Sequence, residues 1–292
     1  MKYQHLLFIL ILVSACSGTK RVVKSTPNKT SETKDIIDDS VKKRTKIIDK
    51  VIPTIITETE NIKGKIIEEP MIGSENNLEV FNHKEFSTLL KEYISENGDI
   101  NYKGIKKDYK NLKNYISNLG QNIPDISWYK EDKLAYWINA YNALTIDLII
   151  QNYPIKSIKD IKNPWDQRLW KFGKKWYNLS DIEHQILRKM DEPRIHFAIV
   201  CASYSCPKLQ NKAFTASNLD AQLTKVTKEF LNDSEKNNIS ENNLELSKIF
   251  QWFAKDFKQN SSLIDFLNQF LDIKISENAK IKYKDYNWAL NE

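Results

Sequence analysis

Apolar residues divide the chain into an N-terminal part without a sustained pattern and a C-terminal part with a strong one. After a short apolar run over residues 6–13, no helical pattern is sustained until Leu78. From there, apolar side chains recur every three or four residues, first at Phe86, Leu89 and Leu90, which is typical of an amphipathic helix. The pattern therefore predicts one folded domain over residues 78–292.

The strongest element of the pattern is the stretch from Leu134 to Ile150, which is apolar on nearly every side. A helix of this kind is buried all round and is usually the central helix of its domain. Aromatic residues on both sides of Gly173 predict a small hairpin over residues 170–177. Further helices are expected around residues 112–119, 217–231, 247–257 and 261–271.

The stretch from Ile195 to Val200 is the best candidate for a β-strand. Alternation along a strand places His196 half-buried on one face, and Cys201 ends the strand. Together with the helices, these elements predict an α-rich α+β fold, in which a buried central helix packs with further helices and a small sheet.

The N-terminus has the plan of a secretory signal, because the positive charge of Lys2 precedes an apolar run that is too short to span a bilayer. Val13-Ser14-Ala15-Cys16 then resembles the lipobox of bacterial lipoproteins. That resemblance implies a signal peptide over residues 1–16 and a lipid on Cys16. The alternative is an ordinary signal peptide that contains a cysteine. The lipid would make the membrane a partner and place the protein outside the cytoplasm, on the cell membrane or the outer membrane.

Residues 17–77 lie between this signal and the predicted domain. They are rich in Lys, Thr, Ser, Glu and Asp and contain no aromatic residue. Such a composition buries too little apolar surface to offset the entropy of the chain, so it predicts a flexible polar tether. The alternative is a short strand or helix around residues 45–68.

Composition and charge narrow the function classes. With 41% hydrophobic, 11% aromatic and 28% charged residues, the chain suits a globular protein with a core. The net charge is +6, but the lysines are scattered and no nucleic-acid motif occurs, so we expect no nucleic-acid partner. The charge favours solubility and some attraction to anionic head groups or cell-wall polymers. No cofactor is expected.

Asn139, Asn142 and Thr145 lie three residues apart, along one stripe of the predicted central helix. A buried amide without hydrogen-bond partners costs about 1–3 kcal/mol. These side chains are therefore expected either to tie the helix to neighbouring backbone or to face a polar pocket.

Ser180 and Glu183 have the spacing of a capping box, which predicts a helix that begins there and continues to about Met190. His184 lies in its first turn, where the helix N-terminus disfavours protonation and leaves a neutral imidazole that can act as a base. The alternative for His184 is a surface position without a role. For His196, the alternative to a role as the base is a core histidine whose hydrogen bonds are satisfied within the protein.

Cys201 and Cys206 lie in one loop and have two interpretations. A disulfide is permitted in an oxidising compartment, and a short loop brings two Cα atoms within the required distance of about 7 Å. Alternatively, Cys201 is a nucleophile activated by His184 or His196, with Glu183 orienting the base. Metal binding needs three or four convergent ligands, and the spacing of these residues matches no zinc site.

Several short motifs occur in the order of a known family. They are residues 136–144 (YWINAYNAL), 179–184 (LSDIEH), 186–188 (ILR), 193–198 (PRIHFA), Cys201 and 205–207 (SCP), with supporting pieces at 98–102, 246–250, Trp252, 256–257 and 286–288. Together they resemble the domain of unknown function 547 family over nearly all of residues 80–292. The resemblance implies a domain of this type, and the family's name implies no activity.

A weaker resemblance concerns the fold. A buried helix followed by a hairpin and a histidine-bearing strand is similar to the papain and transglutaminase-like fold. Enzymes of that fold carry a nucleophilic cysteine at the start of the central helix, whereas residues 134–139 contain no cysteine. A nucleophile would therefore have to come from Cys201 or Cys206.

Two functions follow from these residues. The first is a binding or structural module of a lipid-anchored cell-envelope protein, with a protein or envelope component as its ligand. The second is a thiol-dependent hydrolase or acyl transferase that uses Cys201. Convergence of the cysteine and histidine motifs on one cleft would favour the enzyme.

Overall fold

The computed structural model describes residues 80–259 and 261–292. The predicted signal peptide, Cys16 and the predicted tether over residues 17–77 lie outside this part of the chain. Within it, the longest helix has 23 residues, and no helix is long and apolar enough to cross a membrane.

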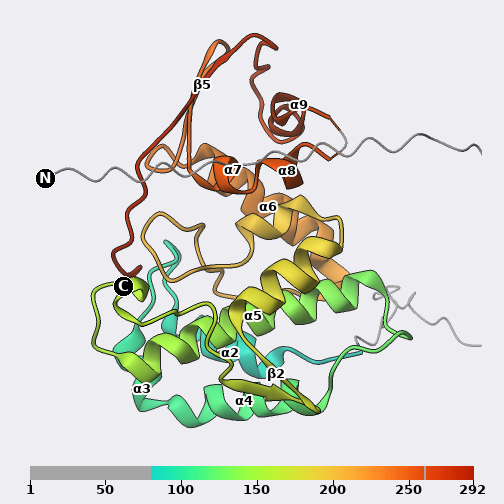
Figure 1. Cartoon of the computed structure of the whole chain (residues 1–292), viewed down its shortest axis with the longest axis vertical. Helices are drawn as coiled ribbons and strands as arrows, with labels where there is room; N and C mark the ends of the chain where they lie inside the picture. The colour runs from blue at the N-terminus through green and yellow to red at the C-terminus, as the bar shows by residue number, and fades with distance from the viewer. Residues whose placement is uncertain (1–79, 260) are drawn as a thin grey trace, which may run out of the picture. The chain divides into compact units, whose positions relative to one another are not determined.

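Helix α5 (Lys130–Asn152) runs through the middle of the domain (Figure 1). Its side chains are buried without interruption over residues 134–150, which confirms the predicted central helix. Because the helix is apolar all round, it needs neighbours on every side. On one side lie α2 (Lys84–Tyr93), α3 (Tyr102–Lys107) and α4 (Tyr109–Gln121), packed on α5 or on each other.

A hairpin of β1 (Trp170–Phe172) and β2 (Lys175–Tyr177) packs against α4. Gly173 in its turn has a φ of +55°, and a Cβ there would lie 2.8 Å from the Ile123 side chain. Glycine adopts this left-handed conformation without steric cost, whereas other residues do not. The predicted hairpin is therefore confirmed.

The remaining elements cover the other side of α5 (Figure 1). They are α6 (Leu219–Asn232), α7 (Ile249–Trp252), α8 (Ala254–Phe257), α9 (Leu263–Asn268) and the strands β3 (Asn238–Ile239), β4 (Asn243–Leu246) and β5 (Lys280–Tyr283). Strand β4 pairs antiparallel with β3 and parallel with β5. The helix expected over residues 247–257 is divided at Phe253 into α7 and α8.

The C-terminal segment returns from β5 across the domain toward α3 (Figure 1). Ala289 bridges to Ser157 and Leu290 bridges to Ser203, each in antiparallel fashion. The Ile100 N–H donates to the Asn291 carbonyl at 2.8 Å. These backbone contacts join segments that lie far apart in the sequence and fix the last residues beside the cysteine loop.

The predicted strand at residues 195–200 is wrong. Residues Pro193–Phe197 form a 3-10 helix, in which the Glu192 carboxylate accepts from the Arg194 N–H. Pro193 favours a helical first turn because its φ is preset and it has no N–H to satisfy. Ile195, His196 and Phe197 are all buried, so the inward and outward alternation of a strand is absent.

The predicted capping box at Ser180 is also wrong. The Ser180 side chain makes no capping hydrogen bond, and the Asp181 N–H donates to Asn178 Oδ1 instead. Residues Asp181–Ile186 form a π-helix, η2, which continues as a 3-10 turn, η3, at Leu187–Lys189. Asn178 therefore takes the capping role in place of Ser180, and Glu183 is buried instead of turning back to the start of the helix.

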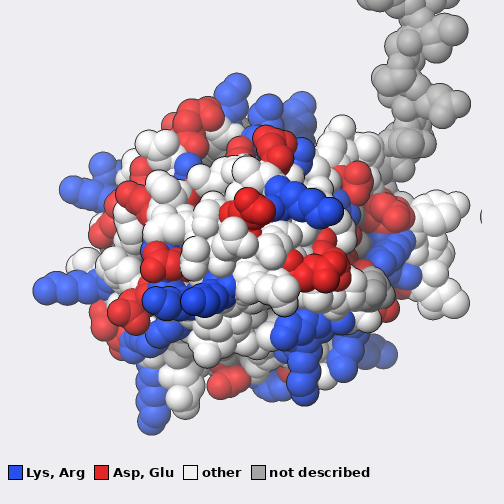
Figure 2. Space-filling view, turned by 90° about the horizontal axis from the view of Figure 1, so that it is seen from above, with Lys and Arg blue, Asp and Glu red and all other residues white. Residues whose placement is uncertain are grey.

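The predicted α-rich α+β fold is confirmed, with one two-stranded and one three-stranded sheet among the described residues. On the face shown in Figure 2, which is seen from above the view of Figure 1, lysines and arginines alternate with acidic residues. A continuous field of one sign is therefore absent from that face, in agreement with the scattered lysines of the sequence.

Candidate functional site

One cavity of about 190 Å³ brings together most of the residues singled out in the sequence. It lies where α5, η2, the loop around residues 196–207, α7 and the C-terminal segment meet. Its walls are largely aromatic and are formed by Trp165, Trp252, Phe253, Tyr286 and Trp288. Trp252 is 46% exposed and marks the side on which the cavity meets solvent.

Glu183 lines this cavity from η2 and is buried. Tyr141 of α5 donates its O–H to Glu183 Oε2 at 3.1 Å. Burial raises the pKa of Glu183 to about 7, although the Tyr141 hydrogen bond and the positive charge of Arg188 act in the opposite direction. Near neutral pH, both the protonated and the ionised carboxyl are therefore present, which is the condition for a general acid or base.

His184 follows Glu183 on η2, and its side chain is 39% exposed. Its Nδ1 lies 3.2 Å from Arg188 Nη1, and because a guanidinium only donates, Nδ1 is the acceptor. The neutral ring therefore carries its proton on Nε2. Burial and the charge of Arg188 lower the pKa of His184. Glu183 Oε1 is 3.9 Å from Nδ1, so Glu183 does not orient this ring as the sequence suggested.

Asp256 of α8 connects the two histidines, because it contacts His196 directly and His184 through Arg188. Its carboxylate accepts from Arg188 Nε at 2.6 Å and Nη2 at 2.8 Å, and His196 Nε2 donates to it at 2.8 Å. Burial alone would raise the pKa of Asp256, but the hydrogen bonds from Arg188 and His196 outweigh it and hold that pKa well below its usual range. Asp256 therefore stays ionised and fixes Arg188, which in turn fixes His184.

His196 is a core histidine with one polar contact. It is buried, and its ring stacks on Phe253 with the centroids 4.0 Å apart. Burial lowers the pKa of His196, whereas the Asp256 contact acts to raise it. Because Nε2 is occupied by Asp256, His196 is better placed to position the network than to take a proton from a ligand.

Cys201 and Cys206 form a disulfide beside the cavity. The Cys201 N–H donates to Cys206 Sγ at 3.0 Å. The Tyr286 hydroxyl lies 3.3 Å from Cys201 Sγ and 3.2 Å from Cys206 Sγ, and it accepts from Ser203 Oγ at 3.0 Å. In this state Cys201 has no thiol, so it is not a nucleophile.

Asn139 and Asn142 do not line the cavity. Each binds one backbone segment at both its donor and its acceptor. Asn139 pairs with the N–H and carbonyl of Phe214 at 2.9 and 2.7 Å, and Asn142 accepts from the Val200 N–H and donates to the Ala198 carbonyl, both at 2.9 Å. They therefore attach neighbouring backbone to α5, and Asn142 fixes the segment that leads into Cys201.

Five of the candidate site residues predicted from the sequence line one cavity: Glu183, His184, His196, Cys201 and Cys206. Arg188 and Asp256 stood in the family motifs but were given no role in the site, although they form an ion pair beside it. Arg188 could have been found, because it lies four residues after His184, on the same helical face. Asp256 is 68 residues away from Arg188, and no local pattern predicts that contact.

Over residues 80–259 and 261–292, no group of three His, Cys, Asp or Glu side chains is arranged to hold a metal ion. The candidate chemistry of the cavity therefore rests on a carboxyl, an imidazole, hydroxyl groups and a disulfide.

No curated protein and no solved structure matches the chain. A match to a protein-family model covers residues 126–231, a shorter stretch than the resemblance over residues 80–292. The matched part contains α5, η2 and the cysteine loop, whereas Asp256 and Tyr286 lie beyond it. The family is described as "Protein of unknown function, DUF547", and the match supports a DUF547 domain over residues 126–231 of this chain.

Proposed function

We propose that this protein is a lipid-anchored component of the bacterial cell envelope, whose DUF547 domain binds a small ligand in the cavity beside Glu183. The observation that carries the proposal is the placement of a carboxyl group with a pKa of about 7 and a neutral imidazole in a cavity with aromatic walls. Concave, mostly apolar sites with a few placed polar groups are typical of small-ligand binding.

The chemistry of the lining residues defines what such a ligand would offer. Protonated Glu183 and the Nε2–H of His184 are hydrogen-bond donors, so the ligand would present acceptor atoms at one end. The indoles of Trp252 and Trp288 and the ring of Tyr286 are packed together, with centroid distances of 4.6–5.8 Å. A flat ring on the ligand would gain contact area against this aromatic wall.

Tryptophan fluorescence of the full chain would test ligand binding, because three indoles line the cavity. A panel of methyl glycosides, N-acetylated amino sugars and aromatic carboxylates would be titrated. We expect at least one to change the emission. We expect Trp252→Ala to weaken its binding at least about tenfold, because the bound ligand would cover this half-exposed indole and aromatic side chains often dominate binding. Trp176→Ala is the matched control, since Trp176 is 50% exposed on the hairpin and does not line the cavity. Equal losses in the two variants would contradict the proposal.

A second candidate is a thiol-dependent hydrolase or acyl transferase, and one observation favours it: Cys201, His184 and Glu183 share the cavity. The reaction requires a dithiol reductant, which would supply two electrons and two protons to the disulfide. Cys201 Sγ would then attack an acyl carbon as its proton passes to His184 Nδ1, which would first have to leave its hydrogen bond with Arg188. The leaving group would take up that proton, and water would release the acyl group from sulfur.

Thiol counting and an ester substrate would test this second function. The binding function predicts no free thiol at residues 201 and 206 before reduction, and no change in p-nitrophenyl acetate hydrolysis after it. The enzyme predicts hydrolysis that begins only on reduction and is lost in Cys201→Ser. Hydrolysis that persists in Cys201→Ser would exclude a Cys201 nucleophile.

The proposed anchor has its own test. Cys16→Ser removes the sulfur that would carry the lipid, so we expect the variant to leave the membrane fraction, whereas Cys201→Ser should remain there. A Cys16→Ser protein that still sediments with membranes would contradict lipid anchoring.

A further inference from the structure

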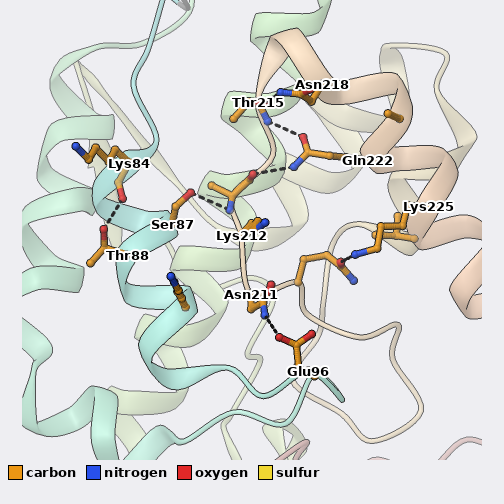
Figure 3. Close-up of a pocket in the computed structure, with 15 residues that line it drawn as sticks. Lys84, Ser87, Thr88, Glu96, Asn211, Lys212, Thr215, Asn218, Gln222 and Lys225 are labelled. Carbon is orange, nitrogen blue, oxygen red and sulfur yellow. Dashed lines mark hydrogen bonds between the residues drawn. The ribbon is translucent and has the colours of Figure 1, made fainter.

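A second concave surface, the basic groove, lies away from the aromatic cavity. It runs between α2 and α6, with the segment at residues 210–215 between them (Figure 3). Its volume is about 740 Å³, much larger than that of the cavity. Four lysines line it: Lys84 and Lys91 from α2, Lys212 from the connecting segment and Lys225 from α6.

The charges along the basic groove are unbalanced. Glu96 is the one carboxylate among the described residues that line it, and it is occupied by a hydrogen bond from Asn211 at 3.0 Å. Lys225 pairs with Glu229 at 3.5 Å. Lys84, Lys91 and Lys212 have no carboxylate within ion-pair distance in the described part of the chain. Three lysines that line one concave surface are therefore not neutralised within the described part of the chain.

Partly buried hydrogen bonds hold the base of this groove in place. The Ala213 N–H donates to Ser87 Oγ at 3.1 Å, which attaches the connecting segment to α2. Gln222 of α6 accepts from the Thr215 N–H and donates to the Ala213 carbonyl, both at 2.9 Å (Figure 3). The lysines therefore project from a pre-formed scaffold, which lowers the conformational cost of binding.

The lining of the groove distinguishes between classes of anionic partner. None of its described lining residues is aromatic, so single-stranded nucleic acid would lack the stacking surfaces on which it is usually bound. Its apolar members are two alanines and one valine, which offer little to insert into a bilayer. Amides and hydroxyls instead alternate with the lysines, as a chain that carries both hydroxyls and negative charges would require.

We propose that the basic groove binds an anionic glycan chain, with Lys84, Lys91 and Lys212 neutralising its acidic groups. This site is separate from the aromatic cavity, so it does not depend on the function proposed for that cavity. The contacts are between solvent-exposed charges, and the binding is therefore sensitive to ionic strength.

Fluorescence anisotropy of labelled polygalacturonate oligomers against the full chain would test the proposal. The ligand control is the fully methyl-esterified oligomer, which keeps the backbone and loses the charge. The groove variant is Lys84→Gln/Lys91→Gln/Lys212→Gln. The protein control is Lys103→Gln/Lys107→Gln/Lys110→Gln, which removes the same charge from three exposed lysines of α3 and α4 that do not line the groove.

We expect the acidic oligomer to bind and the methyl ester not to bind. The groove variant should weaken binding about tenfold, since three ionic contacts with the acidic groups are lost, and the control variant should stay within about twofold. Raising NaCl from about 50 to about 300 mM should weaken binding of the wild type. Absent binding, equal losses in both variants, or tighter groove-dependent binding of oligo-dT or phosphatidylglycerol vesicles would each overturn the proposal.

Discussion

The aromatic cavity and the basic groove differ in whether their charged side chains are paired. Beside the cavity, the buried charge of Asp256 is paired with Arg188 and His196. In the groove, three exposed lysines have no acidic partner among the described residues. A buried charge needs partners because desolvation is costly, whereas water solvates an exposed charge. Mutation and pH should therefore change the stability contributed by the residues around the cavity, whereas salt should change binding in the groove.

Removing Asp256 should have the largest effect on stability. Asp256→Asn keeps the shape of the side chain but leaves the Arg188 guanidinium without its counter-charge. Breaking one partner of a buried ion pair costs about 3–5 kcal/mol. Because the Arg188 side chain is 27% exposed, the free energy of unfolding measured in urea should fall by the lower part of that range, about 3–4 kcal/mol. Asp285→Asn is the control, because Asp285 is fully exposed and its Lys248 contact at 3.5 Å is worth under about 1 kcal/mol. A similar small loss in both variants would show that the cavity's ion pair is no more important than a surface pair.

The backbone attachment by Asn142 should come next. Asn142→Ala leaves the Ala198 carbonyl and the Val200 N–H buried without partners, and each lost partner costs about 1–3 kcal/mol. We expect a loss of about 3 kcal/mol in urea unfolding. Asn152→Ala is the matched control on the same helix, since its amide binds only the Leu148 carbonyl at an exposed end. The cysteine loop should also become more accessible to proteolysis in Asn142→Ala alone.

The pH dependence of Glu183 is a smaller effect with a definite sign. Its pKa is about 7 in the folded protein against 4.5 for the free group, so the folded state holds more protons between these values. Stability linked to Glu183 is therefore fully present below pH 4.5 and is lost as pH rises toward and through 7. The whole shift corresponds to slightly more than about 3 kcal/mol, of which on the order of 2–3 kcal/mol is lost between about pH 5 and about pH 8.

Glu183→Gln should remove this dependence, because glutamine stays neutral and can still accept from Tyr141. The difference in unfolding free energy between wild type and variant would be measured from pH 5 to about pH 8. His184 and His196 have lowered pKa values and act with the opposite sign, but both remain in each protein. Glu277→Gln, at an exposed position, should leave the profile unchanged. An unchanged profile for Glu183→Gln would mean that the carboxyl titrates as an ordinary one.

The elements that the sequence predicted correctly are those whose cause is local. The central helix follows from uninterrupted apolar composition, and the hairpin follows from aromatic strands around Gly173. The segment at residues 195–200 has a β-propensity as strong as that of the hairpin strands, but among the described residues it pairs with no strand. Its Phe197 instead packs among Phe230, Phe250 and Phe257, an outcome decided by tertiary contacts.

The candidate site shows the same difference between features with a local cause and features decided by tertiary contacts. Short motifs were sufficient to single out Glu183, His184 and Cys201. The three residues share one cavity because each lies in a segment that packs on the central helix. Their roles were not predictable, since they depend on distant partners. Tyr141 binds Glu183, and Asp256 binds both His196 and Arg188. Long-range hydrogen bonds of this kind leave no periodic signal in the sequence.

The smallest effect is expected for the stability of the groove variant. Within residues 80–259 and 261–292, Lys84, Lys91 and Lys212 have no ion pair to lose, so their replacement by glutamine should change the unfolding free energy by under about 0.5 kcal/mol. Any change should be a gain at low salt, because three like charges repel one another, and the gain should vanish near about 300 mM NaCl as screening shortens the Debye length below about 10 Å. A loss above about 1 kcal/mol would instead mean that these lysines stabilise the fold. The same variant should lose affinity for the acidic glycan, and a residue set that affects binding without affecting stability is the behaviour expected of a docking surface.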